Sequence, residues 1–94
     1  MVSRYSFGSH IRPHTDTGFF DTSRLATVVL YLNERFEGGN IYFPDLGIEL
    51  KPETGDLLTF YSEFKHGVRP IVSGDRFSLV AFCENDLAYR RTTV

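Results

Sequence analysis

Three histidines and one carboxylate are the first candidates for chemistry in this chain. The histidines lie at positions 10, 14 and 66, and Asp16 follows His14 in the segment His14-Thr15-Asp16. In an extended strand, residues two apart project from the same face, so this imidazole and this carboxylate would point the same way. His66 stands at the expected start of a later strand, and a closed β-fold could bring it to the same place.

Two neutral imidazoles and one carboxylate are the ligand set of non-haem Fe(II) sites that keep open positions for other molecules. Zinc sites more often use thiolates or close four-coordinately, and Cys83 is the only cysteine. A plainer interpretation stays open at this point. His-x-Asp is a short motif that arises often by chance, and a histidine at a strand start is often a polar residue at the rim of a fold.

Short strands are the elements that must position these side chains. Helical periodicity of useful length is missing, and β-branched, aromatic and apolar runs alternate with Gly, Pro, Asn and Asp. The run Ala26–Leu32 is the clearest strand because it is β-branched, aromatic and apolar on both faces. We expect strands at Arg4–Phe7, His10–His14, Ala26–Leu32, Asn40–Phe43, Ile48–Leu50, Asp56–Phe60, His66–Arg69 and Phe77–Phe82, and turns at Glu37–Asn40, Pro52–Asp56 and Val72–Asp75.

Seven or eight short strands separated by turn signals predict an all-β sandwich, jelly roll or small barrel with minimal helix. The longest stretch without strand character is Thr15–Leu25. Loops of that length in a small domain are usually functional. We therefore expect Thr17–Arg24, with Phe19 and Phe20 near its tip, to be a lid over the substrate.

Length and charge exclude several classes of protein. The 94 residues allow one small domain, 1–94. Twelve acidic and ten basic side chains give a net charge of −2 without a cationic run, so we expect no nucleic acid partner. The longest apolar run, Leu25–Leu32, is too short to span a membrane. With no stretch like a signal peptide behind Met1 and a single cysteine, we expect a cytoplasmic protein.

Arg76 comes ten residues after His66 and opens the last expected strand. With it, the chain resembles the 2-oxoglutarate- and Fe(II)-dependent dioxygenases, specifically their prolyl 4-hydroxylase-like branch. The matching segments follow the family's order and spacing over nearly the whole chain. They are Arg4-Tyr5, His14-Thr15-Asp16, Leu30–Asn33, Phe36–Pro44, Lys51–Phe60, His66–Ile71 and Gly74–Phe77.

The resemblance implies a double-stranded β-helix, a jelly-roll or cupin-like barrel of about eight strands, with a metal inside one mouth. It implies that His14, Asp16 and His66 hold Fe(II). Arg76 would pair with the distal carboxylate of 2-oxoglutarate, for which a guanidinium offers a permanently charged, two-pronged donor. Tyr31 and Tyr5 would help to hold the same carboxylate. Alternatives remain for these three residues: a surface ion pair for Arg76 and core packing for the tyrosines.

The activity implied by the resemblance is oxidative decarboxylation of 2-oxoglutarate to succinate and carbon dioxide, coupled to hydroxylation of an unactivated C–H bond. Fe(II), 2-oxoglutarate and O2 are then required, and ascorbate is a candidate reductant. Related halogenases have a small residue in place of the carboxylate ligand, so Asp16 favours hydroxylation. A prolyl residue of a peptide or protein is the favoured substrate, with small molecules also open. The alternative is a non-catalytic cupin-like barrel that binds metal or has a structural role.

Two expectations concern the surroundings of the site. By strand parity Arg12 would share a face with His14 and contact substrate, although Pro13 makes a bulge plausible there, and His10 would lie at the surface. Relatives usually carry further helices and strands that brace the outer sheet. Their absence here suggests either a trimmed enzyme, whose exposed sheet a second copy or partner subunit covers, or the catalytic core of a longer chain.

Overall fold

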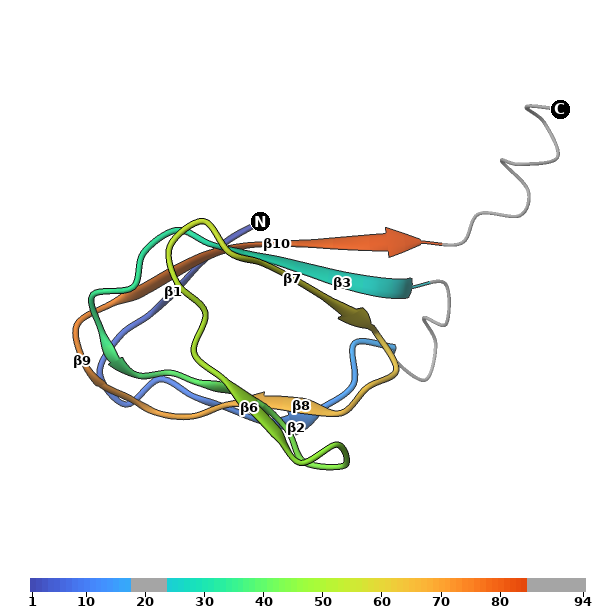
Figure 1. Cartoon of the computed structure of the whole chain (residues 1–94), viewed down its shortest axis with the longest axis horizontal. Coiled ribbons are helices and arrows are strands. Elements are labelled where there is room, and N and C mark those ends of the chain that lie inside the picture. The colour runs from blue at the N-terminus through green and yellow to red at the C-terminus, as the bar shows by residue number, and fades with distance from the viewer. Residues whose placement is uncertain (18–23, 85–94) are drawn as a thin grey trace, which may run out of the picture.

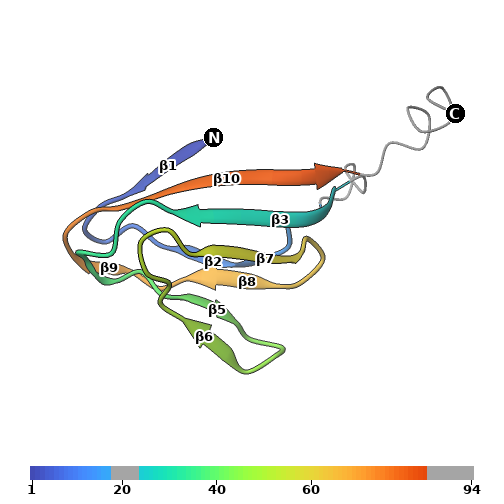
Figure 2. The same cartoon turned by 45° about the horizontal axis from the view of Figure 1, so that its top comes forward.

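Two four-stranded antiparallel sheets face one another across the core (Figure 1). The computed structural model describes residues 1–17 and 24–84. One sheet has the order β1 (Val2–Tyr5), β10 (Arg76–Glu84), β3 (Arg24–Tyr31), β7 (Leu57–Tyr61). The other has the order β2 (Ile11–His14), β8 (His66–Val68), β5 (Ile41–Phe43), β6 (Ile48–Leu50), and a short ladder joins β4 (Glu37–Gly38) to β9 (Ile71–Ser73). In the turned view, β10 lies beside β3 in the first sheet, and β8, β5 and β6 follow one another in the second (Figure 2).

This arrangement confirms the expected all-β double-stranded β-helix. All eight expected strands are present, with most ends shifted by one or two residues, and β6 has the expected bounds. The two additional strands pair with each other: β4 lies inside the expected turn Glu37–Asn40, and β9 overlaps the start of the expected turn Val72–Asp75. They form because Gly38 brings the two segments close together: it has φ +77°, and a Cβ there would overlap the carbonyl oxygen of Pro70.

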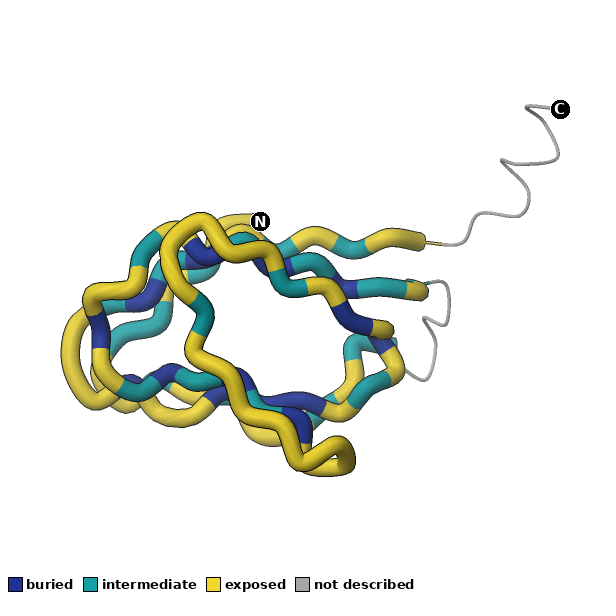
Figure 3. The backbone as a smooth tube through the Cα atoms, viewed as in Figure 1, coloured by how far each residue is buried: buried dark blue, intermediate teal, exposed yellow. Residues whose placement is uncertain are grey.

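The central strand β3 is buried on one face, not on both as the sequence suggested. Thr27, Val29 and Tyr31 point inward and are buried, whereas the residues between them are partly exposed. The core between the sheets consists of Val29, Tyr31, Ile41, Phe43 and Phe60. Figure 3 shows buried positions in both layers, alternating along the strands with intermediate and exposed ones. Polar residues on the inward face of β3, such as Thr27, are therefore available to a site in the interior.

The outward face of the β1–β10–β3–β7 sheet carries a row of apolar side chains. Val2 pairs with Leu79, Leu79 with Leu30, and Leu30 with Leu57, so the four lie side by side across the sheet. Val2 and Leu57 are each 63% exposed, and Leu79 is 36% exposed. In the described residues, then, this apolar row faces outward.

The expected lid, Thr17–Arg24, lies mostly outside the described residues, because 18–23 belong to the part that is not described. The chain at 1–17 and 24–84 contains strands and turns but no helix, and hence no helix able to span a membrane.

Candidate metal centre and cosubstrate pocket

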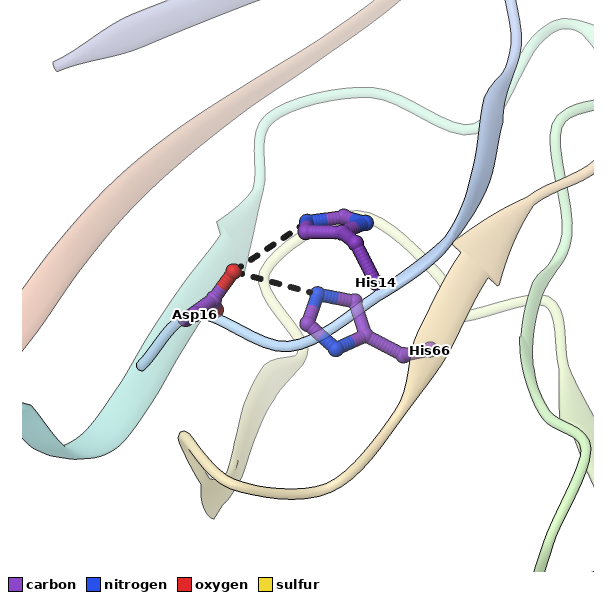
Figure 4. Close-up of side chains that lie close together, drawn as sticks. All are labelled: His14, Asp16 and His66. Atoms are coloured by element: carbon purple, nitrogen blue, oxygen red, sulfur yellow. Dashed lines mark ion pairs between the residues drawn. The ribbon is translucent and has the colours of Figure 1, made fainter. Parts of the chain in front are cut away.

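His14 and His66 lie directly opposite one another on neighbouring strands. His14 ends β2, His66 begins β8, and the two are paired in the register of this antiparallel ladder. Paired residues of a ladder project from the same face, so both imidazoles point into the space between the sheets. Their ring centroids are 4.5 Å apart. The β-fold thus brings together the two histidines that are far apart in the sequence (Figure 4).

Asp16 completes this cluster from the segment that follows β2. Its backbone N–H donates to the carbonyl of Ser62 at 2.8 Å, which fixes the chain just beyond the strand. The carboxylate oxygen Oδ1 lies 3.2 Å from Nε2 of His14 and 3.5 Å from Nε2 of His66. The possible ligand atoms of the three residues all lie within 4.8 Å of one another. Figure 4 shows the side chains converging from three directions.

Both imidazoles are oriented by the same local hydrogen bond. Nδ1 of His14 lies 3.0 Å from the carbonyl oxygen of Arg12, and Nδ1 of His66 lies 3.0 Å from that of Phe64. A carbonyl oxygen only accepts, so each Nδ1 must carry the proton and donate. In the neutral rings Nε2 is then a bare acceptor, and both Nε2 atoms face the acceptor Oδ1 of Asp16. Three acceptors directed at one another fit a bound cation, and two imidazoles with one carboxylate fit Fe(II).

The cluster is buried on one side and open on the other. The side chains of His66 and Asp16 are 8% and 10% exposed, whereas that of His14 is 40% exposed. His66 packs against the ring of Phe60, with centroids 4.6 Å apart. Burial lowers the pKa of His66 below its ordinary value, and its hydrogen bond to Phe64 and the charge of Asp16 oppose this only in part. The neutral imidazole, the form that binds metals, is thereby favoured.

Arg76 lies inside the barrel between two tyrosines. It begins β10, which runs between β1 and β3, and it is paired in register with Tyr5. Its Cζ atom lies 4.8 Å from the ring centroid of Tyr5 and 4.8 Å from that of Tyr31. Nη2 also donates a hydrogen bond to the hydroxyl of Tyr31 at 3.1 Å. Arg76 therefore contacts both tyrosines that are expected to hold the cosubstrate with it.

The guanidinium of Arg76 is only 3% exposed, and two of its nitrogens, Nε and Nη1, have no hydrogen-bond partner within the described part of the chain. A buried cation with unused donors is costly unless an anion satisfies it. Burial raises the pKa of Tyr31 and of Tyr5, while the nearby charge of Arg76 acts in the opposite direction. Both phenols therefore remain protonated and can donate to an anion.

One cavity of about 180 Å³ connects the metal cluster to Arg76. It is smaller than the roughly 300–1,000 Å³ of sites for drug-sized ligands, which suits a small acid. Its lining combines the metal cluster, Tyr5 and Arg76 with apolar side chains of both sheets, whereas Tyr31 is hydrogen-bonded to Arg76 but is not among the described residues of the lining. The lining residues include Tyr5, His14, Asp16, Thr27, Val29, Ile41, Phe60, His66, Val68, Arg76, Ser78 and Val80.

Arg12, expected by strand parity to share a face with His14, does not line the cavity. The register of β2 against β8 shifts between Ile11 and His14, so that three steps along β2 match two steps along β8. This irregularity breaks the parity between Arg12 and His14, and Ile11 lines the cavity instead. Arg12 is exposed and is not among the described residues of the lining. His10 is exposed, as expected.

Two polar residues of the cavity were not identified from the sequence. Ser78 is 1% exposed, and its Oγ has no hydrogen-bond partner among the described residues. It lies two residues after Arg76 on the same strand. Because residues two apart in a strand share a face, this spacing could have identified Ser78 as a neighbour of Arg76 in the site. Thr27 is also 1% exposed and donates its hydroxyl proton to Asp16. It shares the inward face of β3 with Tyr31, four residues away, which was a weaker signal.

Comparison with known proteins agrees with this geometry. The family model described as the 2OG-Fe(II) oxygenase superfamily matches residues 1–84. A putative prolyl 4-hydroxylase of Acanthamoeba polyphaga mimivirus is 38% identical over 64 residues, which cover 57% of this chain and 26% of that protein.

Two solved structures are similar over most of this chain. A prolyl-4-hydroxylase of Pseudomonas putida superposes with a TM-score of 0.79 at 30% identity, covering 92% of this chain and 51% of that one. The viral collagen prolyl hydroxylase of Paramecium Bursaria Chlorella virus-1, in its 2OG complex, gives a TM-score of 0.76 at 28% identity and coverages of 86% and 55%. The chain thus spans about a quarter of the mimivirus relative and about half of each solved structure.

Proposed function

This chain belongs to the 2OG-Fe(II) oxygenase superfamily, and we propose that it hydroxylates an unactivated C–H bond while 2-oxoglutarate is decarboxylated to succinate and carbon dioxide. The observation that carries the proposal is the position of Arg76. Its guanidinium is buried, keeps two unused donors, and opens onto the same cavity as His14, Asp16 and His66. A cavity that combines a cation-binding cluster with a buried anion-binding group fits a metal together with an acidic cosubstrate.

His14, Asp16 and His66 would hold Fe(II) through the two Nε2 atoms and Oδ1, since these acceptors already converge. When bound, Fe(II) and 2-oxoglutarate supply the oxidising chemistry with O2, and the protein supplies orientation and charge complementarity. The Nδ1 hydrogen bonds to Arg12 and Phe64 keep each Nε2 free of a proton. The exposed side of His14 leaves an approach from solvent for the substrate.

Four residues would orient 2-oxoglutarate from the far end of the cavity. Arg76 offers Nε and Nη1 to the distal carboxylate, and Tyr31 adds a hydroxyl beside them. The ring of Tyr5, with its centroid 4.8 Å from Cζ, would restrict the movement of the guanidinium. Ser78 brings a buried hydroxyl in need of a partner. An anion held by several oriented donors in a largely buried site binds in a single orientation, and its reactive end would then face the metal cluster.

We propose a prolyl residue of a peptide or protein as the substrate. The support comes from the similar proteins, which are named as prolyl hydroxylases. Arg12, which is exposed and whose carbonyl oxygen accepts the hydrogen bond of His14, is proposed as a contact for a peptide outside the cavity. Mass spectrometry of proline-containing peptides after incubation should show the gain of one oxygen. Succinate formation without any modified peptide would retain the enzyme class and refute the prolyl substrate, leaving a small molecule as the substrate class.

A direct test uses the chain with Fe(II) and 2-oxoglutarate in the absence of oxygen. We expect the charge-transfer absorption of the iron–keto acid chelate, which requires both components in one site. His66→Ala should abolish the band, whereas His10→Ala should leave it unchanged because His10 is exposed outside the cluster. A band that survives His66→Ala would contradict the assignment of the metal ligands.

The same measurement separates an enzyme from a non-catalytic metal-binding barrel. Such a barrel could use His14, Asp16 and His66, but it would have no need for the unused donors of Arg76. Metal binding without a chelate band, and without succinate in air, would favour the non-catalytic alternative.

We propose ascorbate as the reductant that sustains turnover, and succinate yields with and without it test this.

The exposed apolar row of Val2, Leu79, Leu30 and Leu57 supports a further proposal, that a second copy of the chain covers this sheet. Burying such a row would remove apolar surface from water. Sedimentation should then show a dimer that Leu57→Glu dissociates, and a monomer at all concentrations would refute it.

We also propose a reducing compartment such as the cytoplasm, since Cys83 is a free and exposed thiol.

A further inference from the structure

The two oxygens of Asp16 face different partners. Oδ1 points toward Nε2 of both histidines, while Oδ2 accepts a hydrogen bond from the hydroxyl of Thr27 at 2.5 Å. Thr27 lies on β3, in the β1–β10–β3–β7 sheet, whereas the histidines lie on β2 and β8 in the facing sheet. The carboxylate therefore connects the metal cluster to the opposite sheet.

Ser62 extends this connection by one more hydroxyl. Its Oγ lies 3.0 Å from Oγ1 of Thr27, and both side chains are buried, at 0% and 1% exposure. Thr27 has a single hydroxyl proton, and the carboxylate of Asp16 can only accept it. Ser62 must then donate to Thr27. The result is a chain of hydrogen bonds with one direction, from Ser62 through Thr27 to Oδ2 of Asp16.

The backbone around Ser62 holds the same three segments together. The carbonyl of Ser62 accepts from the N–H of Asp16 at 2.8 Å, and the N–H of Ser62 donates to the carbonyl of Leu25 at 2.9 Å. Ser62 follows β7 directly, and Phe60 on that strand pairs with Thr27. The backbone of Asp16 is thus held by Ser62, and its carboxylate is held by Thr27.

We propose that Thr27 and Ser62 are positioning residues that hold Asp16 to a metal through one oxygen. Engaged by Thr27, Oδ2 is held back from the ion, and the carboxylate cannot rotate to present both oxygens. A carboxylate that binds through one oxygen leaves open the positions that a cosubstrate needs. The inference rests on the proposed function, and it concerns how the ligand is held and not which residues are ligands.

A purely structural role for the two hydroxyls makes a different prediction. If they served only to satisfy one another in the core, their removal would lower stability without a specific effect on metal affinity. Partners that orient a metal ligand typically contribute about 10–100-fold to metal affinity. Metal affinity measured alongside thermal stability therefore distinguishes the two roles.

The experiment measures the affinity of the chain for Co(II), by its absorption, together with the thermal melting of the metal-free protein. Thr27→Val removes the hydroxyl and nearly preserves the shape, so we expect Co(II) affinity to fall by about 10–100-fold. Thr27→Ser keeps the donor and should stay within about threefold of the wild type. Ser62→Ala leaves the proton of Thr27 in place, so its loss should be smaller than that of Thr27→Val.

Thr59→Val is the matched control, because it makes the same chemical change at an exposed position on β7. It should retain wild-type Co(II) affinity. Wild-type affinity in both Thr27→Val and Ser62→Ala would overturn the inference, as would an equal loss in Thr27→Ser or in Thr59→Val. If Thr27→Val does not fold, Ser62→Ala and Thr27→Ser decide between the roles.

The failure of this inference is distinguishable from the failure of the proposed function. If the wild type does not bind Co(II), or if His66→Ala binds it equally well, the metal centre itself is refuted. If the wild type binds Co(II) and His66→Ala does not, while the hydroxyl variants retain full affinity, the metal centre stands and only the positioning role is refuted.

Discussion

Arg76 donates a hydrogen bond from Nη2 to the hydroxyl of Tyr31 at 3.1 Å, in the buried interior of the barrel. The two residues lie on neighbouring strands, β10 and β3, and are 45 positions apart in the chain. Because Tyr31 uses one nitrogen of the guanidinium, the remaining buried donors are left for an anion. The pairing of β10 with β3 therefore brings Tyr31 to the guanidinium that we propose binds the cosubstrate.

Arg76→Ala should weaken 2-oxoglutarate binding by about 100-fold, since loss of one partner of a buried charge pair costs about 2–5 kcal/mol. Metal affinity should persist, because the cluster at His14, Asp16 and His66 is unchanged. Arg76→Lys should recover part of the affinity, as it keeps the charge but loses the planar fork. Titration of the chelate band with 2-oxoglutarate measures the affinity. Arg4→Ala is the control, because Arg4 is exposed and pairs with Asp75; unchanged affinity in Arg76→Ala would refute its role.

Asn33 is expected to support Arg76 from the backbone. Its Nδ2 donates to the carbonyl of Asp75 at 2.7 Å, and its Oδ1 accepts from the N–H of Phe77 at 2.8 Å. The side chain thus holds the peptide groups on both sides of Arg76. Asn33→Ala should lower 2-oxoglutarate affinity by about tenfold, or about 1.4 kcal/mol, with metal affinity retained. Isothermal titration measures both.

The control for this variant is Asn40→Ala, because Asn40 makes an exposed hydrogen bond to Glu49 away from the cavity. It should bind 2-oxoglutarate as the wild type does. Equal losses of 2-oxoglutarate affinity in Asn33→Ala and Asn40→Ala would show that the two hydrogen bonds of Asn33 do not position the guanidinium of Arg76.

Two glycines with the same backbone conformation should respond differently to alanine. Gly38 has φ +77° and its Cβ would overlap the carbonyl oxygen of Pro70, whereas Gly55 has φ +85° and nothing within 4 Å. Gly55→Ala should cost only the left-handed strain, about 1–2 kcal/mol of unfolding free energy. Gly38→Ala should cost this strain plus about 1–3 kcal/mol for the overlap. Urea unfolding compares them, and equal losses would contradict the close approach of β4 and β9.

Stability should depend on pH through the buried phenols. Burial raises the pKa of Tyr31 above its ordinary value of 10.0, so the unfolded chain loses this proton at a lower pH than the folded one. The protonated phenol then stabilises the fold fully below about pH 10, and this contribution is lost as pH rises further. Urea unfolding between about pH 9 and 11 should show a steeper decline for the wild type than for Tyr31→Phe. Parallel declines would contradict the raised pKa.

Local sequence preferences were enough to predict most of the fold. The segment Ile48–Leu50 became β6 without any shift, and the β-branched run at Ala26–Leu32 became β3 with small changes at its ends. These signals are local, because strand propensity and turn residues act within a few positions. The β4–β9 ladder escaped prediction because it depends on a close approach at Gly38 between segments distant in the sequence.

For the site, the sequence determined which side chains were candidates, since imidazole, carboxylate and guanidinium groups are chemically distinct and their spacing follows a family pattern. Only the tertiary structure decided which of them meet. The register sets His14 opposite His66, whereas the shift between Ile11 and His14 places Ile11, and not Arg12, in the lining of the cavity. The hydrogen bonds from Ser62 and Thr27 to Asp16 likewise depend on contacts between strands. Such contacts arise from long-range pairing, which no local pattern of residues encodes.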